Sequence, residues 1–139
     1  MGSLQPGQRM TNLGLLKRDF GAFYPTDHMV VGFRVQMDAE RVLQYLAKQG
    51  APQPAPIELS AQEMIEFAEK NMKGTSAMAN RGACLSTLQV FLDAAKEGVH
   101  FLVIPTPDDA AAERVTQAIH RVPFVLAERY HWLAIATVA

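Results

Sequence analysis

Cysteine is almost absent from this chain of 139 residues, in which Cys84 stands alone. A single thiol excludes an intramolecular disulfide and any zinc or iron–sulfur site built from several cysteines. The composition is typical of a protein from a reducing compartment, and we expect the cytoplasm.

An excess of positive charge is also lacking. Thirteen lysines and arginines stand against fourteen acidic residues, for a formal net charge of −1, and the basic residues are scattered along the chain. No basic stripe is available to neutralise phosphates, so we expect no nucleic-acid partner.

Long apolar runs are missing as well. The longest covers residues 99–105 and is interrupted by His100, whereas a membrane-spanning helix needs roughly 20 apolar residues. We therefore expect no membrane partner.

The length is that of one domain, which at this size buries roughly two-thirds of its unfolded surface. Residues 1–10 are polar and read as a leader, with Met10 as a candidate native start. Gly14, Gly21 and Pro25 interrupt the stretch that follows. We predict a leader and irregular arm over residues 1–27 and a single domain over residues 28–139.

The first strand is predicted over residues 29–37, where alternation places Val31, Phe33, Val35 and Met37 on one face. Asp38 is the predicted N-cap of the next helix, which ends before Gly50. Three alternating prolines then form a stiff connector over residues 51–56.

Two further helices follow. Ser60 and Glu63 have the spacing of a capping box, and this helix is predicted to end at Gly74. After the loop of residues 74–82, a third helix is predicted to close at Gly98, and the two helices could pack as a hairpin.

Residues 99–104 are nearly all apolar, as expected of a central strand covered on both faces. Thr106 is the predicted N-cap of a helix that has Pro107 at its first position and runs to about Arg121. Strands are predicted over residues 124–126 and 130–138. The order β-α-α-α-β-α-β-β predicts an α+β sandwich, with a mixed sheet and helices packed on it.

Cys84 is the most chemically suggestive residue. It follows Arg81 near a predicted helix start, where a cation and the helix dipole would favour the thiolate. His100 or His131 could supply a base only through the fold. The alternative interpretation is a packed core cysteine.

The four histidines, His28, His100, His120 and His131, lack the local spacing that puts two metal ligands on one helical face. His28 and His100 would meet only if their strands ran parallel. We predict no metal site and no cofactor.

Two predicted helix starts are candidate ligand sites. Asp108 and Asp109 suit a Mg²⁺ or general-base role, although helix capping accounts for both. The loop of residues 74–82 opens a helix and is a candidate anion site through Thr75, Ser76, Arg81 and Gly82. An ordinary helix connection is the alternative.

A surface for a partner is suggested by low charge content, by Tyr130 and Trp132, and by Met64, Met72 and Met78, although a core would also bury them. Nothing places a nucleophile, a base and an orienting group together recognisably. The predicted function is a non-catalytic regulatory domain that binds another protein or itself as a homo-oligomer. The alternative is a small enzyme or anionic-ligand-binding protein that uses Arg81 and Cys84 with a distant histidine as base.

Overall fold

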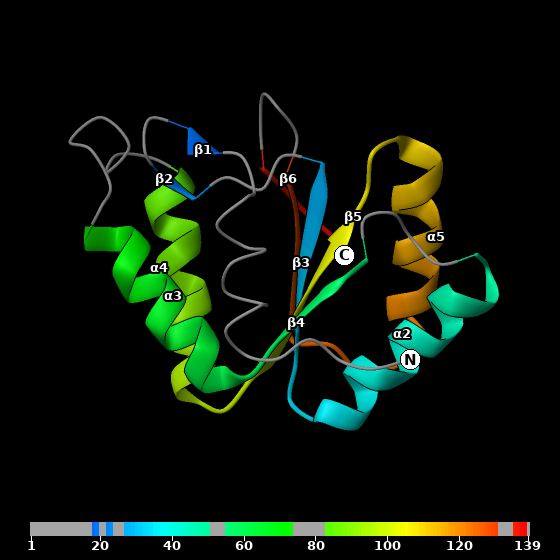
Figure 1. The fold of residues 1–139 in the computed structure, drawn as a ribbon, viewed down its shortest axis with the longest axis horizontal. Coiled ribbons are helices and arrows are strands. Elements are labelled where there is room, and N and C mark those ends of the chain that lie inside the picture. Colours follow the sequence, from blue (N-terminus) through cyan, green and yellow to red (C-terminus); the bar gives the residue numbers. More distant parts are fainter. Residues whose placement is uncertain are drawn as a thin grey trace.

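The computed structural model describes residues 18–19, 22–23, 27–50, 55–73, 83–130 and 135–138. These residues form four helices and one open five-stranded sheet, with a separate two-stranded ribbon (Figure 1). The α+β class is confirmed, and the elements predicted from residue 28 onward occur in the predicted order, with one additional short strand between the first two helices.

The main sheet has the strand order β4-β5-β3-β6-β7. Its strands are β3 (His28–Phe33), β4 (Ile57–Leu59), β5 (His100–Pro105), β6 (Leu126–Tyr130) and β7 (Ile135–Thr137). All four pairings between them are antiparallel, so the prediction of a mixed sheet was wrong.

The connections explain why no parallel pair forms in this sheet. The helix α2 connects β3 to β4, and β5 lies between these two strands in the sheet. In the same way, α5 connects β5 to β6, and β3 lies between them. Strands joined by a helix are thus parallel in direction but separated by one antiparallel strand, as in split β-α-β motifs.

Helices cover both faces of the sheet. Helices α2 (Gln36–Lys48) and α5 (Asp109–Ile119) lie on one face, and α3 (Ala61–Lys73) and α4 (Ala83–Lys96) lie side by side on the other (Figure 1). The predicted packing of α3 on α4 is confirmed. The result is a three-layer arrangement.

The core therefore has two halves, separated by the sheet. Phe101 and Val103 of β5 pack with α3 and α4, whereas Leu102 and Ile104 pack with α2 and α5. All four side chains are fully buried. The prediction that this apolar run forms a central strand covered on both faces is confirmed.

Local signals placed the start of α3 and the ends of α2 and α4 correctly. In the capping box at the start of α3, the Ser60 N–H donates to Glu63 Oε1 at 2.9 Å and the Glu63 N–H donates to Ser60 Oγ at 3.1 Å. Gly50 and Gly98 follow α2 and α4 with φ of +86° and +92°, the left-handed conformation typical of helix C-termini. Gly74 lies outside the described residues.

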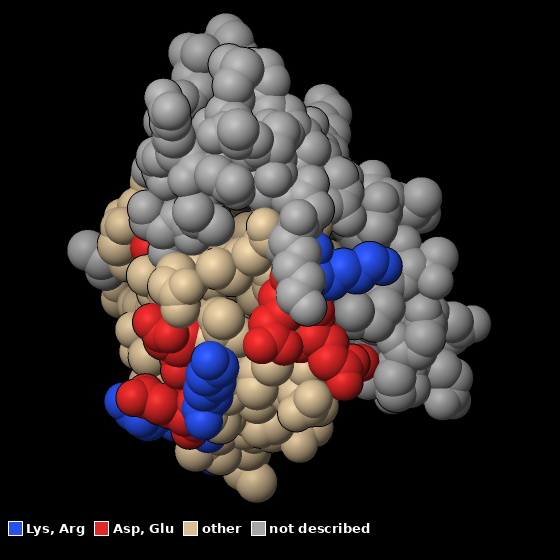
Figure 2. Space-filling view, turned by 90° about the vertical axis from the view of Figure 1, so that its left-hand side faces the viewer, with Lys and Arg blue, Asp and Glu red and all other residues tan. Residues whose placement is uncertain are grey.

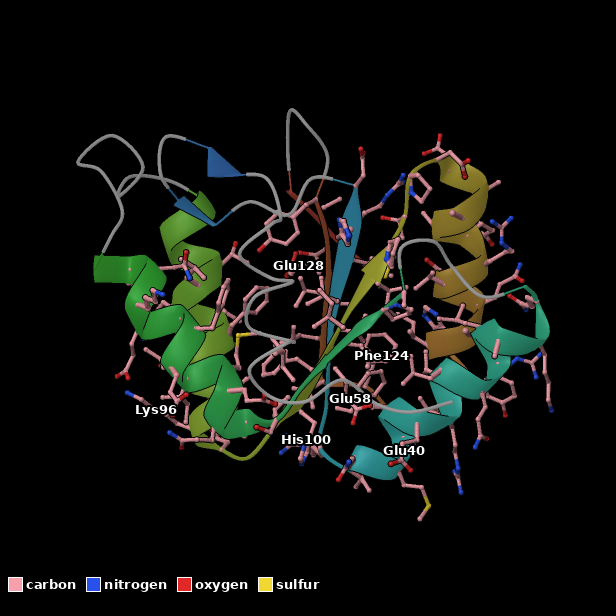
Figure 3. All side chains as sticks on the ribbon, in the orientation of Figure 1. Glu40, Glu58, Lys96, His100, Phe124 and Glu128 are labelled. Atoms are coloured by element: carbon pink, nitrogen blue, oxygen red, sulfur yellow. The ribbon has the colours of Figure 1, made fainter. Side chains whose placement is uncertain are left out.

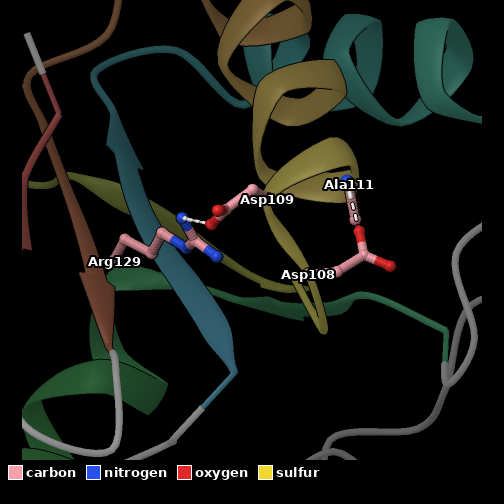
Figure 4. A network of polar contacts seen from close by, with 4 residues as sticks. All are labelled: Asp108, Asp109, Ala111 and Arg129. Atoms are coloured by element: carbon pink, nitrogen blue, oxygen red, sulfur yellow. Dashed lines mark hydrogen bonds and ion pairs between the residues drawn. The ribbon is translucent and has the colours of Figure 1, made fainter.

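The start of α5 differs from the prediction. Its N-cap is Asp108, whose carboxylate accepts from the Ala111 N–H at 2.7 Å (Figure 4). Thr106 is instead buried at the end of β5, where its N–H donates to the Asp27 carbonyl at 2.7 Å. Pairing with β3 thus keeps the chain extended at Thr106, and α5 begins at Asp109 and ends at Ile119.

The junction between β3 and α2 also differs from the prediction. The strand ends at Phe33, and Val35 rather than Asp38 is the N-cap of α2. Met37 therefore lies in α2 and does not share a strand face with Phe33. Its side chain is 57% exposed. Pairing with β5 stops at Phe33, so alternation beyond that point has no strand partner.

Three short strands were not predicted. The strand β4 directly follows the proline connector, and β1 (Arg18–Asp19) and β2 (Ala22–Phe23) form the antiparallel ribbon within the arm expected to be irregular. Of the final strands, β6 begins at Leu126 rather than Phe124 and extends through Tyr130.

Among the described residues, no helix is both long enough and apolar enough to cross a membrane.

Candidate functional site

Most of the sequence-predicted site residues fall outside the described part of the chain. Thr75, Ser76, Arg81, Gly82 and His131 are all in this group. Cys84 is the second residue of α4, and the structure describes only its backbone.

Among the described histidines, His28 and His100 are not brought together. His28 opens β3 opposite Pro105, while His100 opens β5 opposite Phe33. Because β3 and β5 are antiparallel, these histidines lie at opposite ends of the paired strands. In the described ranges there is no group of three His, Cys, Asp or Glu side chains able to hold a metal ion.

His120 has a structural setting at the end of α5. Its Nδ1 lies 2.7 Å from the Thr116 carbonyl oxygen, and its ring packs edge-on against Phe124 with centroids 5.3 Å apart. These contacts hold the turn that leads from α5 into β6.

The two acidic residues at the start of α5 have different partners (Figure 4). Asp108 caps the helix, whereas Asp109 Oδ1 accepts from Arg129 Nη1 of β6 at 3.1 Å. The Arg129 side chain is only 17% exposed, but that of Asp109 is 97% exposed. Capping and an ion pair thus account for both acids without a metal.

Two buried polar atoms in this region have no hydrogen-bond partner in the structure, Thr106 Oγ1 and Arg129 Nε. Thr106 is fully buried. A ligand from solvent would not reach its hydroxyl without a rearrangement, so this region is better described as a structural joint between β5, β6 and α5.

The opposite end of the sheet carries an exposed apolar patch, formed by Val35, Met37 and Val125. Their exposed fractions are 53%, 57% and 37%. Val35 and Met37 follow β3, and the Val125 N–H donates to the Gly32 carbonyl at 2.7 Å, so all three lie where β3 ends and β6 begins. We call this set the end patch.

Polar groups surround the end patch. Arg41 Nη2 lies 4.0 Å from Met37 Sδ and Arg41 Nη1 lies 3.8 Å from Asp38 Oδ1. Gln36 Nε2 donates to Glu58 Oε1 of β4 at 3.3 Å. Figure 3 shows Glu58, Glu40 and His100 toward this same end of the molecule. An apolar centre with a polar rim is the usual composition of a protein-binding surface.

The outer face of α3 and α4 is different in character. Figure 2 shows acidic and basic side chains lying next to one another on the described part of this face, beside uncharged surface. Its exposed large hydrophobic residue, Val90, is 48% exposed and belongs to α4, away from the end patch. Among the described residues of α3 and α4, charges of both signs occur and Val90 is the only exposed large hydrophobic residue.

The end patch was not predicted, because the alternating pattern placed Val35 and Met37 on one face of a strand that was expected to reach Met37. The available signal was Arg34, a charged residue that directly follows β3 and is exposed. Comparison with family models, with curated proteins and with solved structures finds no match for this chain.

Proposed function

We propose that this chain is a non-catalytic domain that acts by association, with another protein or with itself, and that it works in the reducing environment of the cytoplasm. The observation that carries the proposal is the residue at the N-cap of α2. Val35 occupies this position, makes no side-chain capping bond and is 53% exposed.

Valine is a poor choice there on grounds of stability alone. An N-cap Ser, Thr, Asp or Asn would satisfy a free backbone N–H and stabilise the domain by roughly 0.5–2 kcal/mol relative to an apolar residue. Positions that break a local rule without a compensating contact are often functional. Met37 and Val125, the other two residues of the end patch, are also exposed apolar residues, which supports contact with a partner.

The proposal is tested with the double variant Val35→Ser/Met37→Gln. Serine at the N-cap is expected to raise the free energy of unfolding, while the loss of apolar surface weakens association. The variant should be at least as stable as the wild type and yet lose binding. Such a separation would not follow from a packing defect.

The assay compares proteins captured from a cell lysate by tagged wild type and variant, together with light scattering of each purified protein. Val90→Ser is the matched control, because Val90 is similarly exposed but lies on α4. Association that is lost in the double variant and kept in the control supports the proposal. The proposal would be refuted if wild type, double variant and control captured the same proteins and self-associated to the same extent.

The second candidate function is a small enzyme or anionic-ligand-binding protein centred on Arg81 and Cys84. Its support is the position of Cys84 in the first turn of α4, where the helix dipole favours a thiolate. Iodoacetamide labelling of the folded protein at several pH values tests it. Rapid labelling near neutral pH, with loss of a measured activity in Cys84→Ala, would favour this candidate over association.

A further inference from the structure

The two edges of the sheet differ in how they are protected against pairing with another strand. At one edge, β4 follows Pro56 and carries Glu58, and both residue types discourage edge pairing. At the other edge, β7 has the sequence Ile135-Ala136-Thr137, without charge or proline. Among the described strands, none pairs with the outer side of β7.

The register shows which backbone groups β7 presents outward. Thr137 lies opposite Glu128, and the Val138 N–H donates to the Ala127 carbonyl at 2.9 Å. Because antiparallel pairing alternates, the N–H and C=O groups of Ala136 are directed toward β6, whereas those of Ile135 and Thr137 are directed outward. The outer edge therefore offers two donors and two acceptors.

We propose that β7 pairs antiparallel with β7 of a second copy of this chain, around a two-fold axis at Ala136. Ile135 of each copy then lies opposite Thr137 of the other copy. The two donors and two acceptors of each edge meet their complements in four hydrogen bonds. This inference goes beyond the proposed function, because it places self-association at the edge of the sheet rather than at the end patch.

The side chains near the axis fit this pairing. Ala136 is exposed and would face Ala136 of the second copy in a non-hydrogen-bonded pair, where Cα atoms approach to about 4.5 Å. A small residue suits so close a contact. The Thr137 hydroxyl donates to the Glu128 carboxylate on its own chain, with oxygens 3.0 and 3.2 Å apart.

Charge does not oppose the pairing. The charged residue directly opposite Ala136 on β6 is Arg129, whose side chain is paired with Asp109. In the paired sheet the two copies of Arg129 would be three strand spacings apart, roughly 14 Å, which exceeds the Debye length of about 8 Å at physiological ionic strength. A charge placed on Ala136, in contrast, would directly face its own copy.

Sedimentation equilibrium of the wild-type chain over about 10–500 µM tests the inference, since a short edge pairing makes a weak interface. We expect a concentration-dependent equilibrium between monomer and dimer. Ala136→Lys and Ala136→Glu should each weaken the dimer by up to about fivefold, because like charges lie opposite each other. An equimolar mixture of the two variants should form a heterodimer.

Val90→Lys is the control, since it adds the same charge on α4 and should leave the dimer unchanged. A wild-type chain that stays monomeric over the whole range overturns the inference, as does a dimer that survives both Ala136 variants. If that surviving dimer is lost in Val35→Ser/Met37→Gln, the edge pairing is wrong and the proposed function stands.

Discussion

Gly32, near the end of the central strand β3, provides a sharp test of how closely the core is packed. A Cβ atom added at Gly32 would lie 2.9 Å from Val99 Cγ1 and 3.3 Å from both Leu126 Cγ and Phe101 Cε2. Val99 is 1% exposed and Phe101 is fully buried, so neither has open space to move into. Gly32→Ala therefore forces a shift in the core between the sheet and helices α3 and α4.

The expected cost follows from overpacking. Adding a methyl group to a filled core typically costs about 1–3 kcal/mol. For a domain of 139 residues, an unfolding entropy near 2.1 cal/mol/K per residue converts this cost to a Tm lower by roughly 3–10 °C. The gain in β propensity from Gly to Ala is smaller than this and has the opposite sign.

The assay is urea unfolding of wild type, Gly32→Ala, Val99→Ala and the double variant. Val99→Ala removes the atom at 2.9 Å, so the double variant should lose less stability than the two single variants added together. Strict additivity, or a Gly32→Ala variant as stable as the wild type, would refute the packing argument. Circular dichroism at low urea checks that each variant is folded.

Three further predictions concern the helix starts. Asp108→Ala should lower the free energy of unfolding by about 1 kcal/mol in urea titration, because it removes the bond to the Ala111 N–H; an unchanged midpoint would show that this cap contributes nothing. Thr106→Val should leave stability unchanged or raise it in the same titration, because a buried hydroxyl without a partner is replaced by a methyl group of similar size; a loss of 1 kcal/mol or so would reveal a hidden partner. Ser60→Ala should cost about 1 kcal/mol by thermal unfolding through the broken capping box, and an equal melting temperature would contradict this.

Features decided by neighbours in the sequence were predictable. The Ser60–Glu63 capping box joins residues three apart, and the glycines at positions 50 and 98 end helices through their own backbone angles. The apolar run of β5 indicated burial on both faces because no other environment suits it. These signals were enough for the α+β class and the order of elements.

The candidate sites were less predictable, for two separate reasons. His28 and His100 are 72 positions apart in sequence, and only the strand direction decides whether they meet; the antiparallel pairing keeps them apart. The roles of Arg81, Gly82, Thr75, Ser76 and His131 remain predictions, since these residues lie outside the described ranges.

Tertiary pairing decided where the regular elements begin and end. Alternation favoured a strand through Met37, but pairing with β5 stops at Phe33 and the chain turns into α2, which leaves Val35 and Met37 exposed. The hydroxyl of Thr106 suited a cap, but its backbone bond to Asp27 holds it in the extended chain, so Asp108 caps α5 instead. The amino-acid sequence alone determined which helices and strands form and their approximate order, because residue propensities and helix capping act over a few residues. Which residues become exposed or paired depends on contacts between distant segments, and these form only when the sheet assembles.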